Sequence, residues 1–254
     1  MKTIWITALA KDTARVAAVG DQLKRYGLQS KGHFWVDDPA KMAWRVAYDA
    51  LREARADAWL VLVDAAEMAK PSVRYGLSLL GAALSAQTPG FPVLLLWEAE
   101  PAEPPALLRD AANLSQNQAW PAKVVAKANL RAVPTALEYR FEVFGDERLG
   151  QWFEIAPTAG AWDGIVFGVA GEGAEIDFQA VGPHGGLPEK TVLEYAQQGL
   201  RIETGARVFN AWALRNRIDG DQVYYARVKG RPDAVLFMPY ADDSESEATI
   251  LTLC

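Results

Sequence analysis

Residues 57–98 read DAWLVLVDAAEMAKPSVRYGLSLLGAALSAQTPGFPVLLLWE, and this stretch decides the fold of the first half of the chain. It holds two almost entirely apolar runs, at residues 57–64 and 92–98, with an apolar helix-like segment at 71–86 between them. Continuous apolar runs are typical of strands buried on both faces, as in parallel sheets between helices. The connection is long enough for a crossover helix, so the stretch predicts a β-α-β unit.

Strands and helices alternate on both sides of this unit, over residues 1–135. Such alternation is typical of an open parallel α/β sheet, and we expect five strands here. The other elements expected are strands 3–9, 33–36 and 119–126 (the last at an edge, because it contains Pro121), a helix that begins after Asp12, and helices 40–54 and 106–114.

From residue 136 the pattern changes to short alternating segments separated by glycine, proline and aspartate. The dipeptide Asp219-Gly220 between two strand-like runs indicates a two-residue hairpin. The sequence predicts two domains, an α/β domain at 1–135 and a mostly antiparallel α+β domain with one main helix at 136–254. The elements expected in the second domain are strands 139–144, 151–156, 164–169, 174–181, 208–218, 222–229, 234–240 and 247–253, and a helix at 188–200.

The charges are distributed unevenly between the two halves. Residues 1–135 contain 16 Lys+Arg and 13 Asp+Glu, a net charge of +3, whereas residues 136–254 contain 10 and 19, a net charge of −9; together these give the total of −6. The asymmetry supports two separate units. A net negative charge argues against non-specific binding to nucleic acid or to anionic membranes.

The cysteine and histidine content limits the redox and metal chemistry. Cys254 is the only cysteine, so the chain has no disulfide framework. This cysteine content is compatible with a protein in a reducing compartment. The histidines, His33 and His184, are far apart in sequence, so a zinc site would have to be mostly carboxylate, and we expect no metal and no cofactor. No apolar run approaches the roughly 18–20 residues of a membrane span, and we expect a cytoplasmic protein.

Ligands of open parallel sheets bind outside the carboxyl ends of the strands. The first strand is followed neither by G-x-G-x-x-G nor by a P-loop, which disfavours a dinucleotide or P-loop nucleotide site. Lys11 and the amides that open the first helix could hold an anion; the alternative is a surface lysine beside a helix cap. Asp37, Asp38 and Asp64 could form a carboxylate cluster that holds a hard cation; the alternative is helix capping by Asp38. We assign no catalytic residue. The ligand-binding candidates are Lys11, Asp12, Asp37, Asp64, Ser72, Arg74 and Glu98.

A family resemblance begins within the same central stretch. The strings ADAWLVLVD at 56–64, SVRYG at 72–76 and PVLLL at 92–96 resemble the nucleoside 2-deoxyribosyltransferase and Toll/interleukin-receptor (TIR)-like group, with a similar layout over residues 1–130. The resemblance implies cleavage of an N-glycosidic bond, with a helix glutamate acting at the anomeric carbon.

This chain departs from that pattern at the position of the glutamate. Arg74 stands there, and no acidic residue occurs between Glu67 and Glu98. A guanidinium in place of a carboxylate reverses the sign of the charge at this position, so it cannot stabilise a positive anomeric carbon. It could instead bind a phosphate or a carboxylate. The alternative for Arg74 is a surface residue on the first turn of a buried helix.

The second domain resembles the PsbP-like α+β fold, which implies a binding or assembly module. The residues that carry this resemblance are FEIAP at 153–157, Trp162 and the segment 193–200. His184 lies in the glycine-rich loop 182–186 without a visible serine or cysteine nucleophile, so catalysis by this histidine is not expected.

Three functions follow as hypotheses. The first is a non-catalytic recognition or scaffold protein that binds a partner protein or a small nucleotide-like anion, but neither nucleic acid nor membrane. The second is an enzyme that acts on N-glycosidic bonds of nucleosides or NAD, with Asp64 or Glu98 replacing the missing glutamate. The third is an immunity-type protein whose acidic domain neutralises a basic partner.

Overall fold

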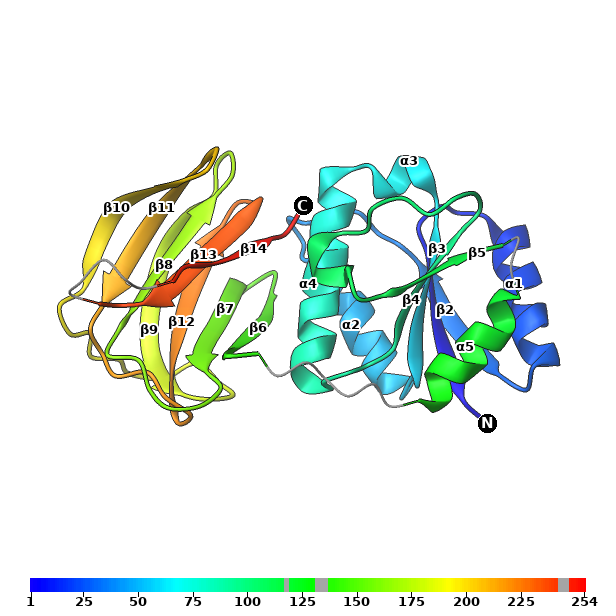
Figure 1. Ribbon diagram of the computed structural model, residues 1–254, viewed down its shortest axis with the longest axis horizontal. Coiled ribbons are helices and arrows are strands. Elements are labelled where there is room, and N and C mark those ends of the chain that lie inside the picture. The colour runs from blue at the N-terminus through cyan, green and yellow to red at the C-terminus, as the bar shows by residue number, and fades with distance from the viewer. Residues whose placement is uncertain (117–118, 131–136, 242–246) are drawn as a thin grey trace. The chain divides into compact units, whose positions relative to one another are not determined.

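The chain folds into two compact units, Met1–Pro134 and Thr135–Cys254, in the computed structural model (Figure 1). The structure describes residues 1–116, 119–130, 137–241 and 247–254. The boundary predicted between residues 135 and 136 therefore lies outside the described residues. Each unit is described by itself.

The first unit contains the predicted five-stranded parallel sheet, which confirms this part of the fold class. The strand order is β2-β1-β3-β4-β5, and every neighbouring pair is parallel. From β1 the chain adds β2 on one side, and it then returns to add β3 on the other side. The switch point at which such sheets place ligands therefore lies between β1 and β3. The strands are β1 (Thr3–Ala8), β2 (Gln29–Phe34), β3 (Ala58–Val63), β4 (Val93–Trp97) and β5 (Ala112–Ser115).

Helices cover both faces of this sheet (Figure 1). On one face, α1 and α5 bury Leu23 and Val124 against Ile6, Leu60 and Leu96 of the strands. On the other face, α2 and α4 pack beside each other. The helices are α1 (Thr13–Arg25), α2 (Ala43–Glu53), α3 (Ala65–Met68), α4 (Pro71–Gln87) and α5 (Trp120–Asn129), with a 3₁₀ turn η1 (Ala106–Leu108). No helix among the described residues has the length and apolar content needed to cross a bilayer.

Two predicted elements of the first unit are wrong in type. The segment 119–126, expected to be an edge strand, lies in helix α5, and Pro121 occupies its first turn, where a missing N–H has no cost. The fifth strand is instead β5, within the segment 106–114 expected to be helical. Only the short turn η1 of that segment is helical.

The second unit consists of two antiparallel sheets, which confirms its predicted antiparallel character. Their strand orders are β10-β11-β8-β13-β14 and β6-β7-β12-β9. Phe167 of the first sheet contacts Phe153 and Tyr224 of the second, with ring centroids 6.0 and 5.8 Å apart, so the two inner faces share an aromatic core. The strands are β6 (Tyr139–Asp146), β7 (Gly150–Pro157), β8 (Ile165–Ala170), β9 (Glu175–Pro183), β10 (Gln197–Thr204), β11 (Arg207–Leu214), β12 (Gln222–Lys229), β13 (Ala234–Pro239) and β14 (Thr249–Thr252).

The helix predicted at 188–200 is wrong, because this segment is irregular and then enters strand β10. Tyr195 has a left-handed backbone, with φ of 47°, which a helix does not accommodate. Val192 and Tyr195 are 80% and 77% exposed, so the apolar spacing of the segment does not correspond to a buried helix face. The described part of this unit contains no helix. The predicted hairpin is also wrong: β11 pairs with β10 and β8, and the turn at Asp219 leads into β12, which pairs with β7 and β9.

One buried hydrogen bond between side chains links β1 to β3, and it generates a test. The indole Nε1 of Trp59 donates to Oγ1 of Thr7 at 2.8 Å, and both residues are fully buried. Thr7→Val removes the acceptor and should lower the free energy of unfolding by about 1–3 kcal/mol, because it leaves the indole N–H unpaired. The control Thr7→Ser keeps the acceptor and should cost only about 1 kcal/mol for the lost methyl group. Urea unfolding measures both, and equal stability of the valine variant and the wild type would contradict the prediction.

His33 makes the stability of the first unit depend on pH. Trp5 Nε1 donates to His33 Nδ1 at 2.9 Å, and burial lowers the pKa of His33 from 6.5 to about 4. The unfolded chain therefore binds the proton first as the pH falls, and the stabilisation present above pH 6.5 should decrease by up to about 3 kcal/mol between pH 6.5 and 4. His33→Gln retains an acceptor for the indole and should flatten this part of the profile in urea unfolding. A profile as steep as that of the wild type would show that another group is responsible.

Candidate functional site

The candidate site of the first unit lies at the carboxyl ends of β1 to β4. Two of the predicted ligands, Asp12 and Asp64, cap helices there. Asp12 Oδ1 accepts from the backbone N–H of Arg15, and Asp64 Oδ1 accepts from that of Glu67, both at 2.9 Å. This is the ordinary N-cap interaction, and it ties both carboxylates to their own helices.

A small polar cluster forms around the start of α4. Ser72 Oγ donates to Asp37 Oδ2 at 2.7 Å, and Lys70 Nζ lies 2.7 Å from Glu67 Oε1. The pKa of Lys70 is raised chiefly by the hydrogen bond to Glu67, desolvation opposes this, and the charges of Glu67, Asp37 and Asp64 raise the pKa further. The structure thus joins Ser72 to Asp37, and the charges of Asp37 and Asp64 both act on Lys70.

Arg74 occupies the position of the missing glutamate and binds the protein's own backbone. Its Nη1 donates to the carbonyl of Glu103 at 3.1 Å, and its Nη2 donates to that of Pro104 at 3.0 Å. The guanidinium therefore fastens α4 to the segment after β4.

Arg15, which the sequence analysis did not select, holds the strand ends from the other face of the sheet. Its guanidinium donates to the carbonyls of Val63 and Leu96 at 3.1 and 3.3 Å and pairs with Glu98 at 3.1 Å. The side chain of Arg15 is 10% exposed and that of Glu98 is 58% exposed. The only sequence signal for this role is its place three residues after the cap Asp12, in the first turn of a helix that follows a strand.

The predicted ligands come from both faces of the sheet. Lys11 and Asp12 precede α1, whereas Ser72 and Arg74 belong to α4, on the opposite face of the sheet (Figure 1).

Little space remains beside the polar cluster. The cavity lined by Trp35, Asp37, Ser72 and Gly76 has a volume of about 10 Å³. The ring of Trp35 fills the space, since a Cβ added to Gly76 would lie 2.6 Å from it. Pockets that hold small molecules usually measure about 300–1,000 Å³.

Two larger cavities of this unit lie away from the start of α4. One of about 650 Å³ lies between α1 and α5, with Asp12 and Arg15 in its wall. Another of about 810 Å³ lies at the amino ends of the strands, near Asp57. Asp64 and Glu98, the proposed substitutes for a catalytic glutamate, line none of these three cavities.

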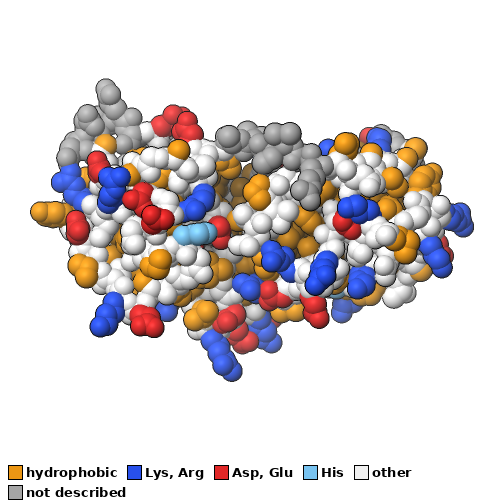
Figure 2. Space-filling view, turned by 90° about the horizontal axis from the view of Figure 1, so that it is seen from below, with side chains coloured by type: hydrophobic (Ala, Val, Ile, Leu, Met, Phe, Trp, Pro, Cys, Tyr) orange, Lys and Arg blue, Asp and Glu red, His pale blue; other side chains and the backbone are white. Residues whose placement is uncertain are grey.

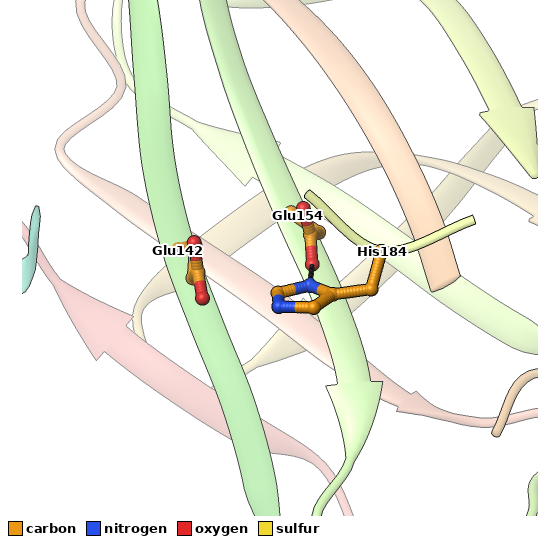
Figure 3. A group of neighbouring side chains, drawn as sticks. All are labelled: Glu142, Glu154 and His184. Carbon is orange, nitrogen blue, oxygen red and sulfur yellow. Dashed lines mark hydrogen bonds and ion pairs between the residues drawn. The ribbon is translucent and has the colours of Figure 1, made fainter. Parts of the chain in front are cut away.

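A second group of functional side chains lies in the second unit. Glu142 of β6 and Glu154 of β7 are directly opposite each other in the strand register, and the ring of His184 lies between their carboxylates (Figure 3). His184 Nδ1 and Glu154 Oε1 are 2.5 Å apart. One ligand atom from each residue lies within 4.8 Å of the other two, which makes this a group that could hold a metal ion.

Tyr225 positions this group from the neighbouring strand β12, where it is paired with Glu154. Its hydroxyl donates to the carbonyl of Pro183 at 2.5 Å and accepts from the N–H of Gly186 at 3.4 Å, so it holds the loop on both sides of His184. Burial, followed by the negative charge of Glu154, raises the pKa of Tyr225, which keeps the hydroxyl protonated and able to donate.

The sequence analysis selected His184 only as an improbable catalyst and did not select the two glutamates. A signal was present, because Glu142 and Glu154 are equally distant in sequence from the turn at 147–149 and a tight hairpin must place them opposite each other. The position of His184 beside the two glutamates depends on the path of the chain after β9, and no local sequence pattern indicates that path.

Comparisons with known proteins add little beyond the fold. No family model and no curated protein matches the sequence. Among solved structures, the NMR structure of the pseudo-receiver domain of the CikA protein is similar, with 20% identity, a TM-score of 0.36, and coverage of 53% of this chain and 100% of that chain. This is a weak match to an open parallel α/β sheet, and the TIR or deoxyribosyltransferase-like assignment is not confirmed.

The roles of Arg15 and Glu98 can be separated by two substitutions. Arg15→Lys should lower the free energy of unfolding by about 1–3 kcal/mol, because one ammonium group cannot reproduce the fork that reaches two backbone carbonyls. Glu98→Gln, at the exposed end of the same ion pair, should change it by less than about 1 kcal/mol. Urea unfolding at one pH measures both. A larger loss for Glu98→Gln than for Arg15→Lys would contradict a structural role for the arginine.

Proposed function

We propose that this chain is a non-catalytic recognition or scaffold protein of the cytoplasm, whose α/β unit binds a partner protein through the carboxyl ends of its strands. The observation that carries the proposal is the small space beside the start of α4 at that end of the sheet, about 10 Å³ next to Trp35 and Ser72. A surface with so little depth suits another protein better than a small molecule.

The chemistry of this surface also favours a protein partner. The strand-end surface comprises Val36, Asp37, Asp64, Glu67, Lys70 and Ser72. Val36 is 61% exposed, while the polar residues around it carry charges of both signs. An exposed apolar side chain surrounded by hydrogen-bonding groups is a common arrangement in protein interfaces.

The two alternatives have less support. An N-glycosidic enzyme needs a carboxylate facing a cavity, and Asp64 is used as a helix cap while Glu98 pairs with Arg15. An immunity-type protein would present a broad acidic surface to a basic partner. On the face that Figure 2 shows, acidic and basic side chains are intermingled.

The partner interface can be tested with two exposed valines of the same unit. Val36→Arg should reduce capture of the partner at least tenfold, because it places a long charged side chain in the middle of the strand-end surface. Val46→Arg, at a valine of α2 that is 70% exposed, is the matched control and should leave capture unchanged. The measurement is quantitative mass spectrometry of proteins cross-linked to wild type and to each variant in cells of the source organism. Identical profiles for the two variants would overturn the proposed surface.

The non-catalytic part of the proposal is tested separately in the same preparations. NAD, ADP-ribose and deoxynucleosides should neither raise the melting temperature of the protein nor be turned over. Turnover that Asp64→Asn or Glu98→Gln abolishes would establish the enzyme instead.

A further inference from the structure

We propose that Glu142, Glu154 and His184 bind a divalent transition-metal ion, with Zn²⁺ as the ion to test. Their ligand atoms already lie within 4.8 Å of one another. Ligands held at 2.0–2.2 Å from a tetrahedral zinc ion are about 3.4 Å apart, so modest side-chain rotations would complete the set. This inference goes beyond the proposed function and does not depend on it.

The kinds of donor atom select the class of ion. Two carboxylates and a neutral imidazole balance the charge of one divalent cation. Mg²⁺ and Ca²⁺ prefer sites made of oxygen atoms alone, whereas imidazole nitrogen suits zinc and its neighbours in the first transition row. Three protein ligands leave at least one position for water or for a further ligand.

The electrostatics of the site call for a cation. The side chain of Glu154 is 4% exposed, and a buried carboxylate is costly unless a positive charge faces it. Glu142 lies directly opposite on the neighbouring strand, and like charges in that position repel. A divalent ion would place two positive charges beside these two carboxylates.

The surrounding structure supports the ligands as a metal site requires. Two of them stand on adjacent strands of one sheet, which fixes their backbones. The third is in a loop, but the hydroxyl of Tyr225 holds Pro183 and Gly186 on either side of it. Groups of this kind behind the ligands orient them and tune the affinity for the metal.

Metal binding would change the interaction of His184. An ion bound through the nitrogen that now faces Glu154 would replace the hydrogen bond between the two residues. It would also link β6, β7 and the loop after β9.

The test uses the full chain carrying Cys254→Ser, which removes the only thiol, after treatment with a chelator. Calorimetry with ZnCl₂ should show one ion per chain, and excess ZnCl₂ should raise the melting temperature by mass action. His184→Gln and Glu142→Gln, both at positions outside the apolar core, should each weaken Zn²⁺ binding at least tenfold. Glu175→Gln, an exposed carboxylate of the same unit, and His33→Gln, the other histidine, should bind Zn²⁺ within twofold of the parent.

A second readout reports the ligands directly. Co²⁺ in place of Zn²⁺ should give visible absorption that His184→Gln removes while circular dichroism stays unchanged. Absence of Zn²⁺ binding, or equal affinity of the folded His184→Gln and Glu142→Gln variants and the parent, would overturn the site and leave only the hydrogen bond between His184 and Glu154. Partner capture through Val36 is unaffected by either result, so the two proposals fail separately.

Discussion

The first unit depends on the close approach of α4 to its neighbours. Most of this helix is buried, and two glycines on it admit large side chains: a Cβ at Gly76 would lie 2.6 Å from the ring of Trp35, and one at Gly81 would lie 2.4 Å from Leu108. Two parts of the chain that are distant in sequence thereby pack directly onto the helix backbone. The same contact determines what the strand ends can do, because the indole of Trp35 fills the space that a small ligand would occupy.

The central β-α-β unit was predictable from sequence because its apolar runs and its buried helix exceed any competing signal. The failures came where a short segment was judged by local pattern. The stretch at 119–126 contains β-branched residues and a proline, but the proline suits the first turn of α5, and burial of Trp120 and Val124 against the sheet decides for the helix. The stretch at 188–200 has helical spacing of apolar residues, but Leu200 packs on the sheet as part of β10. In both cases tertiary burial overrides propensity.

The candidate sites show the same division between local and distant information. Helix capping by Asp12 and Asp64 follows from residues three positions apart, so its chemistry was legible in the sequence. The sequence did not indicate on which face of the sheet each candidate lies. Lys11 precedes α1, whereas Arg74 belongs to α4 on the opposite face (Figure 1). The pairing of Glu142 with Glu154 follows from one hairpin register. The approach of His184 depends on how β9 and β12 pair, which brings together residues about 30 positions apart or more.

Charge balance distinguishes the two groups of carboxylates. In the first unit, the acids at the strand ends are neutralised within the chain: Asp37 and Asp64 lie near Lys70, and Glu98 pairs with Arg15. These acids are also largely solvated, so each pair contributes little energy and leaves no demand for an outside cation. In the second unit, Glu142 and Glu154 are opposed beside His184, and Glu154 is nearly inaccessible to water. The cost of burying charge rises as solvent is excluded, so two opposed carboxylates are more costly beside Tyr225 than the solvated acids at the strand ends. That difference, rather than the number of acids, is the reason to place metal binding in the second unit and protein recognition in the first.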